Sequence, residues 1–467
     1  MKKVWLVVAL VALGGLTSKT FADVQNIRIS GDIRIRGYFL DSAGLVTSEA
    51  GDTQDKGNAS FISQRTRVSV EADLEDHVLV VVTLKAEDHW GDDNDVDKTG
   101  AGTGPVDNGD GDSINRGWVL GVTEAYVQFN ELFYTPATLK VGRQYLHYGR
   151  GLIISSTEQE YNYDAARLVL DYYPLTIDLV GAELVNNQLF GATPSHGGAN
   201  DLLFINARYE LSDSAIKDVE MYFGWISQSQ SGPDGPGTGP FSTGRVPPTV
   251  GGSSPLLIGL RSDMNLTEGL QTWVEGAFEF GGDGFGDSSG KTIDAFLFNL
   301  GGRYTLKDVQ WAPVLNATYT FASGGGPNNS DGAFRPWFDY VDGYNGYLFA
   351  PALSNIHIFN LGGSVKPYEN TTLSLQGYYY LKADHDSFAG SNGNVDFGGL
   401  GIAPDGSSSD IGWEIDAILG YDYSKDVRMQ LVYGVFLPSG AFKAEKGAAV
   451  DMSRAAEEVR AELNVKF

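Results

Sequence analysis

Residues 27–39 read IRISGDIRIRGYF and contain the pattern that decides the fold. Every second residue from Ile27 to Phe39 is isoleucine, glycine or phenylalanine, whereas the residues between them include three arginines, a serine and an aspartate. A period of two predicts a β-strand with one apolar face and one polar, water-facing face. The stretch is also longer than the ~10 residues that a tilted strand needs to cross a membrane.

The same alternation recurs to the C-terminus in segments of similar length. Eighteen segments fit it: 27–39, 62–73, 78–89, 119–130, 137–147, 163–173, 175–184, 202–212, 217–228, 255–265, 269–280, 292–305, 309–322, 354–366, 369–382, 411–423, 426–437 and 455–467. The sequence therefore predicts an all-β protein with about 18 strands.

The lengths of the connections distinguish a membrane barrel from a soluble fold. Long connections such as 40–61, 90–118 and 229–254 alternate with short ones such as 74–77 and 424–425. Outer-membrane barrels have short periplasmic turns, longer extracellular loops and an even number of strands. We therefore expect a transmembrane, antiparallel, up-and-down β-barrel, with a secreted β-sandwich or β-helix as the alternative.

The last segment supports the same interpretation. It alternates through Val459, Ala461, Leu463 and Val465 to a terminal Phe467. This ending resembles the C-terminal signal of Gram-negative outer-membrane barrels, which the barrel-assembly machinery reads. The segment could also form an amphipathic helix, but a barrel must close on its first strand at this point, and this favours a strand.

Residues 1–22 have the pattern of a targeting segment. Two lysines precede the apolar run 4–16, which is too short to span ~30 Å of hydrocarbon comfortably, and Thr20-Phe21-Ala22 forms an acceptable cleavage site. We expect a signal peptide at 1–22 and a barrel at 23–467 in the cell outer membrane; a single anchor helix is the alternative. Only four residues separate Ala22 from Ile27, so any constriction is expected from loops or inward side chains.

The composition excludes several classes of protein. The 467 residues include no cysteine, which excludes disulfide scaffolds and Cys-ligated metal sites. The net charge of −26 argues against nucleic-acid binding, which depends on a basic surface. No cofactor is implied.

Arginines recur on the polar faces of the predicted strands. Such a barrel is too wide for side chains to fill, so it holds an aqueous or plugged lumen, and rings of arginine select anions in pores. Acids on the same faces could instead pair with the arginines and give an unselective lining. The inward arginines expected from parity are Arg28, Arg34, Arg36, Arg65, Arg67, Arg167, Arg261, Arg303, Arg428 and Arg460, and the candidate acids are Asp32, Glu71, Glu124, Asp171, Glu275 and Glu414.

Residues 87–112 contain nine acids and one lysine. Calcium prefers oxygen ligands, so a loop-bound calcium, or a divalent ion that bridges to lipopolysaccharide, is one interpretation. The stretch lacks the spacing of an EF-hand and its closing glutamate, and this favours a solvated acidic loop.

Three motifs resemble the alginate export family of outer-membrane barrels: TEAYVQF (123–129), LKVGRQYLHYGRG (139–151) and YDAARLVLDYYP (163–174). FRPWFDYVDGYNG (334–346) and residues 412–442 look like the large loop and the penultimate hairpin of that family. The resemblance implies an 18-stranded barrel that exports an anionic polysaccharide through an arginine-rich constriction.

The resemblance also implies that Glu124, Arg143, Asp164 and Arg167 face the lumen. The sequence departs from the family pattern at Ala165, where a glycine is expected. The parity of Asp164 is opposite to that of Arg167. Arg143 shares the parity of outward residues unless Gly142 introduces a bulge, as glycine in a strand often does.

The sequence therefore predicts a channel that passes an anionic polysaccharide or a small anion through an arginine-lined pore. The alternatives are a general diffusion porin of weak selectivity and a surface adhesin or receptor barrel. An enzyme is not expected, because none of the six histidines lies in a recognisable nucleophile motif. The expected surroundings are outer-membrane lipid and lipopolysaccharide. The pore-lining candidates are Arg34, Arg36, Arg65, Arg67, Glu124, Arg143, Asp164, Arg167 and Arg460.

Overall fold

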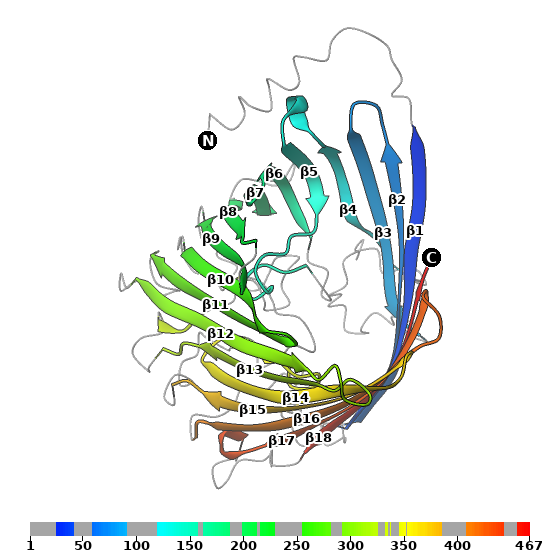
Figure 1. The fold of residues 1–467 in the computed structure, drawn as a ribbon, viewed down its shortest axis with the longest axis vertical. Coiled ribbons are helices and arrows are strands. Elements are labelled where there is room, and N and C mark those ends of the chain that lie inside the picture. Colours follow the sequence, from blue (N-terminus) through cyan, green and yellow to red (C-terminus); the bar gives the residue numbers. More distant parts are fainter. Residues whose placement is uncertain are drawn as a thin grey trace, which may run out of the picture.

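A computed structural model shows one closed antiparallel sheet of 18 strands (Figure 1). It describes residues 25–41, 58–90, 119–156, 162–186, 199–212, 215–228, 255–281, 292–325, 332–334, 337, 345–351, 353–384, 408–442 and 455–467. Each strand pairs with its neighbours in the sequence, and β1 pairs with β18 to close the wall. The expected up-and-down barrel is confirmed. The expected signal peptide and residues 91–112 of the acidic stretch lie outside the described residues.

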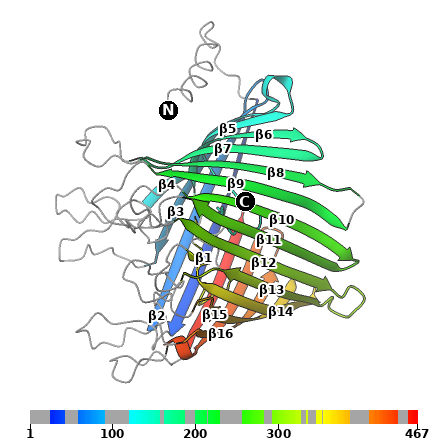
Figure 2. The same cartoon turned by 90° about the vertical axis from the view of Figure 1, so that its left-hand side faces the viewer.

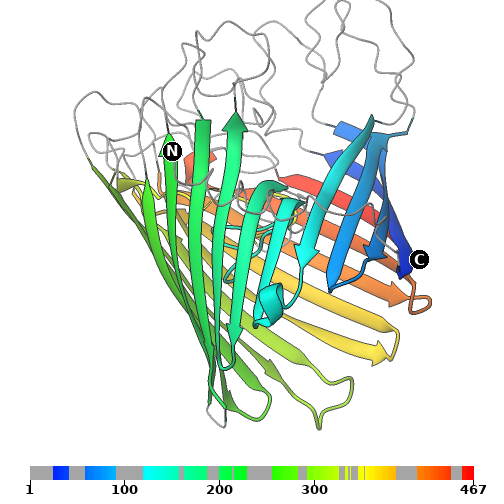
Figure 3. The ribbon, with the colours of Figure 1, turned by 90° about the horizontal axis from the view of Figure 1, so that it is seen from above.

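The strands follow one another around the wall in sequence order and are tilted together (Figures 2 and 3). Their bounds are β1 Asn26–Asp41, β2 Asn58–Asp73, β3 Val78–His89, β4 Val119–Phe129, β5 Ala137–Gln144, β6 Tyr163–Tyr172, β7 Leu175–Asn186, β8 Ala199–Glu210, β9 Ile216–Gln228, β10 Leu256–Thr267, β11 Leu270–Gly281, β12 Ile293–Thr305, β13 Val314–Ala322, β14 Ile356–Tyr368, β15 Thr371–Lys382, β16 Asp410–Asp422, β17 Val427–Pro438 and β18 Ala456–Lys466. Two short 3₁₀ turns, η1 Leu132–Tyr134 and η4 Gly440–Phe442, follow β4 and β17. No helix in the described part of the chain is long and apolar enough to cross a membrane.

Most strands begin or end within a few residues of the expected bounds, and two of the differences have a clear local reason. β13 begins at Val314 rather than at residue 309, because Trp311 and Ala312 have left-handed backbone angles and Pro313 follows. β5 ends at Gln144 rather than at residue 147, because the chain leaves the wall there and enters the lumen.

The register assigns each residue to one face of the wall, because direct cross-strand partners share a face. The outward rows are apolar and exposed, for example at Ile29, Leu260 and Phe296. The inward rows carry most of the charges. Closure at the C-terminus includes two backbone hydrogen bonds between Phe467 and Gly31, of 2.8 and 3.0 Å.

Candidate functional site

The inward faces of β18, β1, β2 and β3 form a continuous charged surface, which we name the basic wall. Direct pairing places Arg34 opposite Arg65 and Asp32 opposite Arg67 on this surface. Its described inward positions hold eight basic and six acidic side chains, an excess of two positive charges. The basic side chains are Arg28, Arg34, Arg36, Arg65, Arg67, Lys85, Arg460 and Lys466; the acidic ones are Asp32, Glu71, Asp73, Glu87, Glu458 and Glu462.

Ion pairs link most of these charges. Asp32 accepts from Arg65 at 3.1 Å and from Arg67 at 2.5 Å, and Glu462 accepts from Arg36 at 2.5 Å. Further pairs join Arg34 to Glu87 at 3.5 Å, Arg460 to Glu458 at 2.6 Å and Arg28 to Glu71 at 2.9 Å. The sequence suggested either arginines that line the lumen or arginines that pair with acids. On the basic wall the arginines do both.

The arginines of the basic wall differ in their access to the lumen. Arg34, Arg65 and Arg460 are buried. The side chain of Arg67 is 29% exposed, and Lys85 beside it is 26% exposed. Arg67 and Lys85 are therefore two of the charges on this wall that a solute can approach.

Arg143 and Asp164 lie on the outer face of the wall. They are direct cross-strand partners and form a bidentate pair with two distances of 2.8 Å. Gly142 has a φ of +126°, but β5 pairs with β4 and β6 without a register shift, so no bulge turns Arg143 inward. The expectation that these two residues face the lumen is thus contradicted by strand parity.

Glu124 and Arg167 do face inward. Glu124 accepts a hydrogen bond from the Thr83 hydroxyl at 3.0 Å, and Arg167 donates to Asp178 at 3.0 Å. Arg167 lies directly opposite Lys140 on β5, which adds a second basic side chain to this part of the lumen.

The first inward segment, residues 145–156, leaves β5 and enters the lumen (Figure 1). The backbone N–H of Gly149 donates to Glu220 at 3.1 Å, and that of Arg150 donates to Glu275 at 2.8 Å. The Tyr222 hydroxyl donates to the other oxygen of Glu275 at 2.8 Å. The wall therefore binds the backbone of this segment through two carboxylates.

The second inward segment, residues 345–351, is bound in the same way on the other side. Glu414 accepts the N–H groups of Leu348 and Phe349, both at 2.9 Å, and Asp416 accepts the N–H of Tyr347 at 3.3 Å. The Tyr380 hydroxyl donates to the carbonyl of Asn345 at 2.6 Å.

Gly346 allows this close approach between the second inward segment and the wall. Its φ is +113°, and a Cβ there would overlap the Tyr380 hydroxyl and the Glu414 carboxylate.

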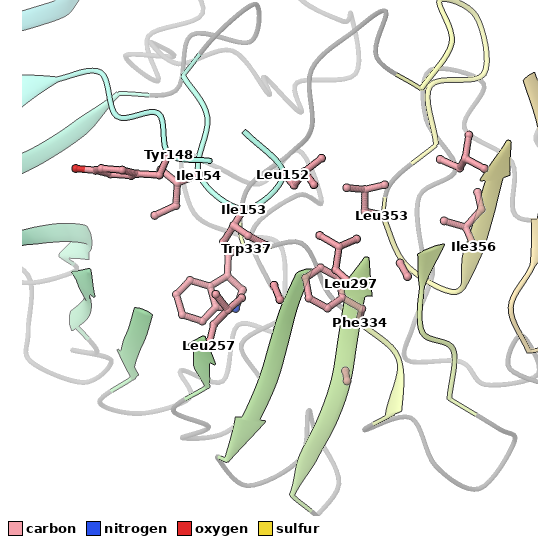
Figure 4. Close-up of a cluster of buried hydrophobic side chains, with 14 of the residues drawn as sticks. Tyr148, Leu152, Ile153, Ile154, Leu257, Leu297, Phe334, Trp337, Leu353 and Ile356 are labelled. Carbon is pink, nitrogen blue, oxygen red and sulfur yellow. The ribbon is translucent and has the colours of Figure 1, made fainter. Parts of the chain in front are cut away.

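Apolar side chains fill the space between the inward segments and the wall (Figure 4). Leu152 and Ile154 of the first inward segment belong to one buried cluster with Phe334, Trp337 and Leu353. Phe349 stacks on Phe436 with ring centroids 4.5 Å apart. Burial of this much apolar surface stabilises both segments inside the lumen.

Arg460 joins the second inward segment to the seam between β1 and β18. Its guanidinium lies 5.0 Å from the ring of Tyr38 and 5.3 Å from the ring of Tyr347, and it donates to the Tyr347 carbonyl at 3.4 Å. Arg460 is buried, and its contacts therefore support the second inward segment rather than bind a solute.

Burial of the first inward segment shifts the pKa of two of its side chains, and both shifts favour the neutral form. His147 lies 3.2 Å from the Ser155 hydroxyl, and burial lowers the pKa of the imidazole below its usual 6.5. Burial also raises the pKa of the Tyr148 hydroxyl, which donates to Asp178 at 3.0 Å.

The roles of Glu275 and Glu414 differ from the expected pairing with arginine. Both are fully buried and bind backbone N–H groups of the inward segments. The sequence contained one signal for this arrangement. The apolar run Leu152–Ile154 lies in a connection, where exposed apolar residues would be costly.

The closed wall, its apolar outer surface and its charged lumen define an outer-membrane β-barrel channel. A model of the alginate export family matches residues 26–456, so the chain belongs to that family. The description of the family, alginate export, is that of a transport family.

Solved structures of similar fold include Acinetobacter baumannii OccAB1, with a TM-score of 0.55 and 12% identity over 97% of this chain and 99% of that one. Pseudomonas aeruginosa OpdO has a TM-score of 0.53 and 14% identity, with 95% and 98% of the two chains covered. P. aeruginosa OccK11 (OpdR) has a TM-score of 0.51 and 13% identity, with 94% and 96% covered. No curated protein matches the sequence.

Proposed function

We propose that the protein passes an anionic polysaccharide or another anionic solute through the lumen. The observation that carries the proposal is the charge balance of the basic wall. Its inward positions have an excess of two positive charges, and the acids Glu220, Glu275, Glu279, Glu414 and Asp416 on the remaining wall are buried. Fixed charge of one sign in a narrow lumen concentrates ions of the opposite sign, and a positive excess therefore favours an anionic solute.

The test removes two arginines that a solute can approach, one on the basic wall and one on β6. Arg67→Ala with Arg167→Ala is expected to lower the anion-to-cation permeability ratio about fivefold at low salt, the factor that corresponds to ~1 kcal/mol. Reversal potentials across a salt gradient in planar bilayers measure the ratio. The effect should shrink at 1 M salt, where the Debye length falls to about 3 Å.

Arg143→Ala is the matched control, because Arg143 lies on the outer face of the same region. It should leave the reversal potential unchanged. A wild type that prefers cations, or a double variant with unchanged reversal potentials, would refute the proposal.

A weakly selective diffusion porin is the second candidate. The ion pairs of Asp32 with Arg65 and Arg67 favour it, because paired charges attract mobile ions less strongly. The same reversal potentials distinguish the two candidates.

The surroundings of the barrel belong to the same proposal. We place it among outer-membrane lipid and lipopolysaccharide, after export through a signal peptide at 1–22 and insertion by the barrel-assembly machinery. Sequencing of the mature N-terminus should give Asp23 as the first residue.

A further inference from the structure

The inner face of β13, β14 and β15 differs from the basic wall in its chemistry. Toward the end of the barrel that carries the short turns, eight of its inward positions are uncharged: Val314, Asn316, Thr318, Asn360, Gly362, Ser364, Ser374 and Gln376. Lys366 follows Ser364 on β14 with the same parity and lies nearer the turn. The flanking inward charges are Arg303 on β12 and the buried Asp416 on β16. The lumen therefore has a neutral polar surface beside charged ones.

Three amides on this surface form one hydrogen-bonded group, which we name the amide patch: Asn316, Asn360 and Gln376. The Asn316 Nδ2 donates to the Asn360 Oδ1 at 2.9 Å and to the Gln376 Oε1 at 3.0 Å. The Gln376 Nε2 donates to the Asn316 Oδ1 at 3.2 Å, and the Asn360 Nδ2 donates to the Gln376 Oε1 at 3.2 Å. This network holds the three side chains in one arrangement.

The amide patch is accessible from the lumen. Its three side chains are partly exposed, whereas the inward residues farther from the turns, such as Thr320, Ile358 and Tyr380, are buried. Gly362 contributes to this access, because a Cβ there would overlap the Gln376 amide, which lies against the wall.

The amide patch lies beside the level at which the second inward segment contacts the wall. Tyr380 contacts Phe349 of that segment, with ring centroids 4.9 Å apart, and pairs with Ile358, the inward neighbour of Asn360. The patch therefore adjoins this contact on the side of the turns.

We propose that the amide patch binds the hydroxyl groups of a saccharide. An amide offers both N–H donors and a carbonyl acceptor, and a hydroxyl group both donates and accepts, so the two are matched without any charge. Among the described residues, the internal bonds leave one Gln376 N–H and lone pairs on the Asn316 and Asn360 oxygens to meet hydroxyls. Several weak neutral contacts hold a chain without trapping it, as conduction requires.

This inference rests on the proposed function and narrows the solute to a polyhydroxylated one. The basic wall would bind the acidic groups of the chain, and the amide patch would bind its hydroxyls. A small carboxylate without hydroxyl groups would use only the basic wall.

The experiment uses a neutral probe, so that the amide patch is tested apart from charge. Block of the single-channel current by maltohexaose is recorded for the wild type and for Asn360→Leu with Gln376→Met, which keep the side-chain size and remove the hydrogen-bonding groups. The residence time of the sugar is expected to fall at least threefold in the double variant. Heat-modifiable mobility on gels checks that the barrel is assembled.

Asn206→Leu is the matched control, because Asn206 faces inward on β8, is buried and receives the same substitution. It should leave the residence time unchanged. The inference is overturned if maltohexaose does not block the wild type, or if the double variant retains the wild-type residence time. Reversal potentials in small salts are expected to stay at the wild-type value in both variants. They test the anion proposal, whereas the residence time of the neutral sugar tests the amide patch, so the failure of one can be told from the failure of the other.

Discussion

Replacing Glu414 by glutamine is expected to loosen the second inward segment. The carboxylate is fully buried and accepts the N–H groups of Leu348 and Phe349, both at 2.9 Å. Glutamine keeps the volume but exchanges one acceptor oxygen for an amide NH₂, which cannot accept from the backbone N–H that faces it. One bond to a charged acceptor is lost, and one buried N–H is left without a partner.

The magnitude follows from these two losses. A hydrogen bond to a charged group contributes roughly 1.5–3 kcal/mol, and an unsatisfied buried donor costs about 1–3 kcal/mol, so we expect about 2.5–6 kcal/mol in total. This corresponds to a shift of about 60- to 20,000-fold in the equilibrium between the seated and the released segment. Tyr380 and the apolar contacts of Phe349 remain.

Single-channel recording is the assay. The variant should show a higher mean conductance and added flicker, because a released segment no longer narrows the lumen. Glu183→Gln, at an exposed outward position of β7, is the control and should behave as the wild type. A Glu414→Gln channel that is heat-modifiable and has wild-type conductance and noise would refute the role of the carboxylate.

Two further predictions concern the ends of the wall and the first inward segment. Deletion of Phe467 should reduce the assembled, heat-modifiable fraction, because its two backbone hydrogen bonds to Gly31 are lost at closure; full assembly would contradict this. Acidification should weaken the seating of the first inward segment. The pKa of His147 is lowered in the folded state. Its contribution to the stability of the seated segment is therefore complete above the ordinary pKa of 6.5, and it is lost as the pH falls from 6.5 toward the lower folded pKa. Conductance noise should rise over this range in the wild type and not in His147→Gln; a rise of equal size in both would exclude the imidazole as its source.

The fold was predictable because it depends on local periodicity. Alternation of period two locates strands wherever one face meets lipid and the other meets water, and all 18 strands were found from it. Errors arose where a turn imitates the pattern: Val309 and Trp311 alternate like strand residues, yet the left-handed backbone at Trp311 belongs to a turn.

The site was only partly predictable. Parity correctly placed Arg34, Arg67 and Arg460 on the inward face, but it could not show that Arg34 and Arg460 are buried. The contacts of the inward segments were beyond sequence reasoning, since Arg150 meets Glu275 across 125 positions of the chain. Motif resemblance was misleading for Arg143 and Asp164, where strand parity alone gave the correct face.

The contacts of Arg460 link the seating of the second inward segment to the completion of the barrel. Arg460 belongs to the last strand, Tyr38 to the first, and Tyr347 to the segment between β13 and β14. These three residues can meet only after the two ends of the chain have come together. The second inward segment therefore gains this contact in the same event that seals the wall, and a barrel still open between β1 and β18 lacks this support for it.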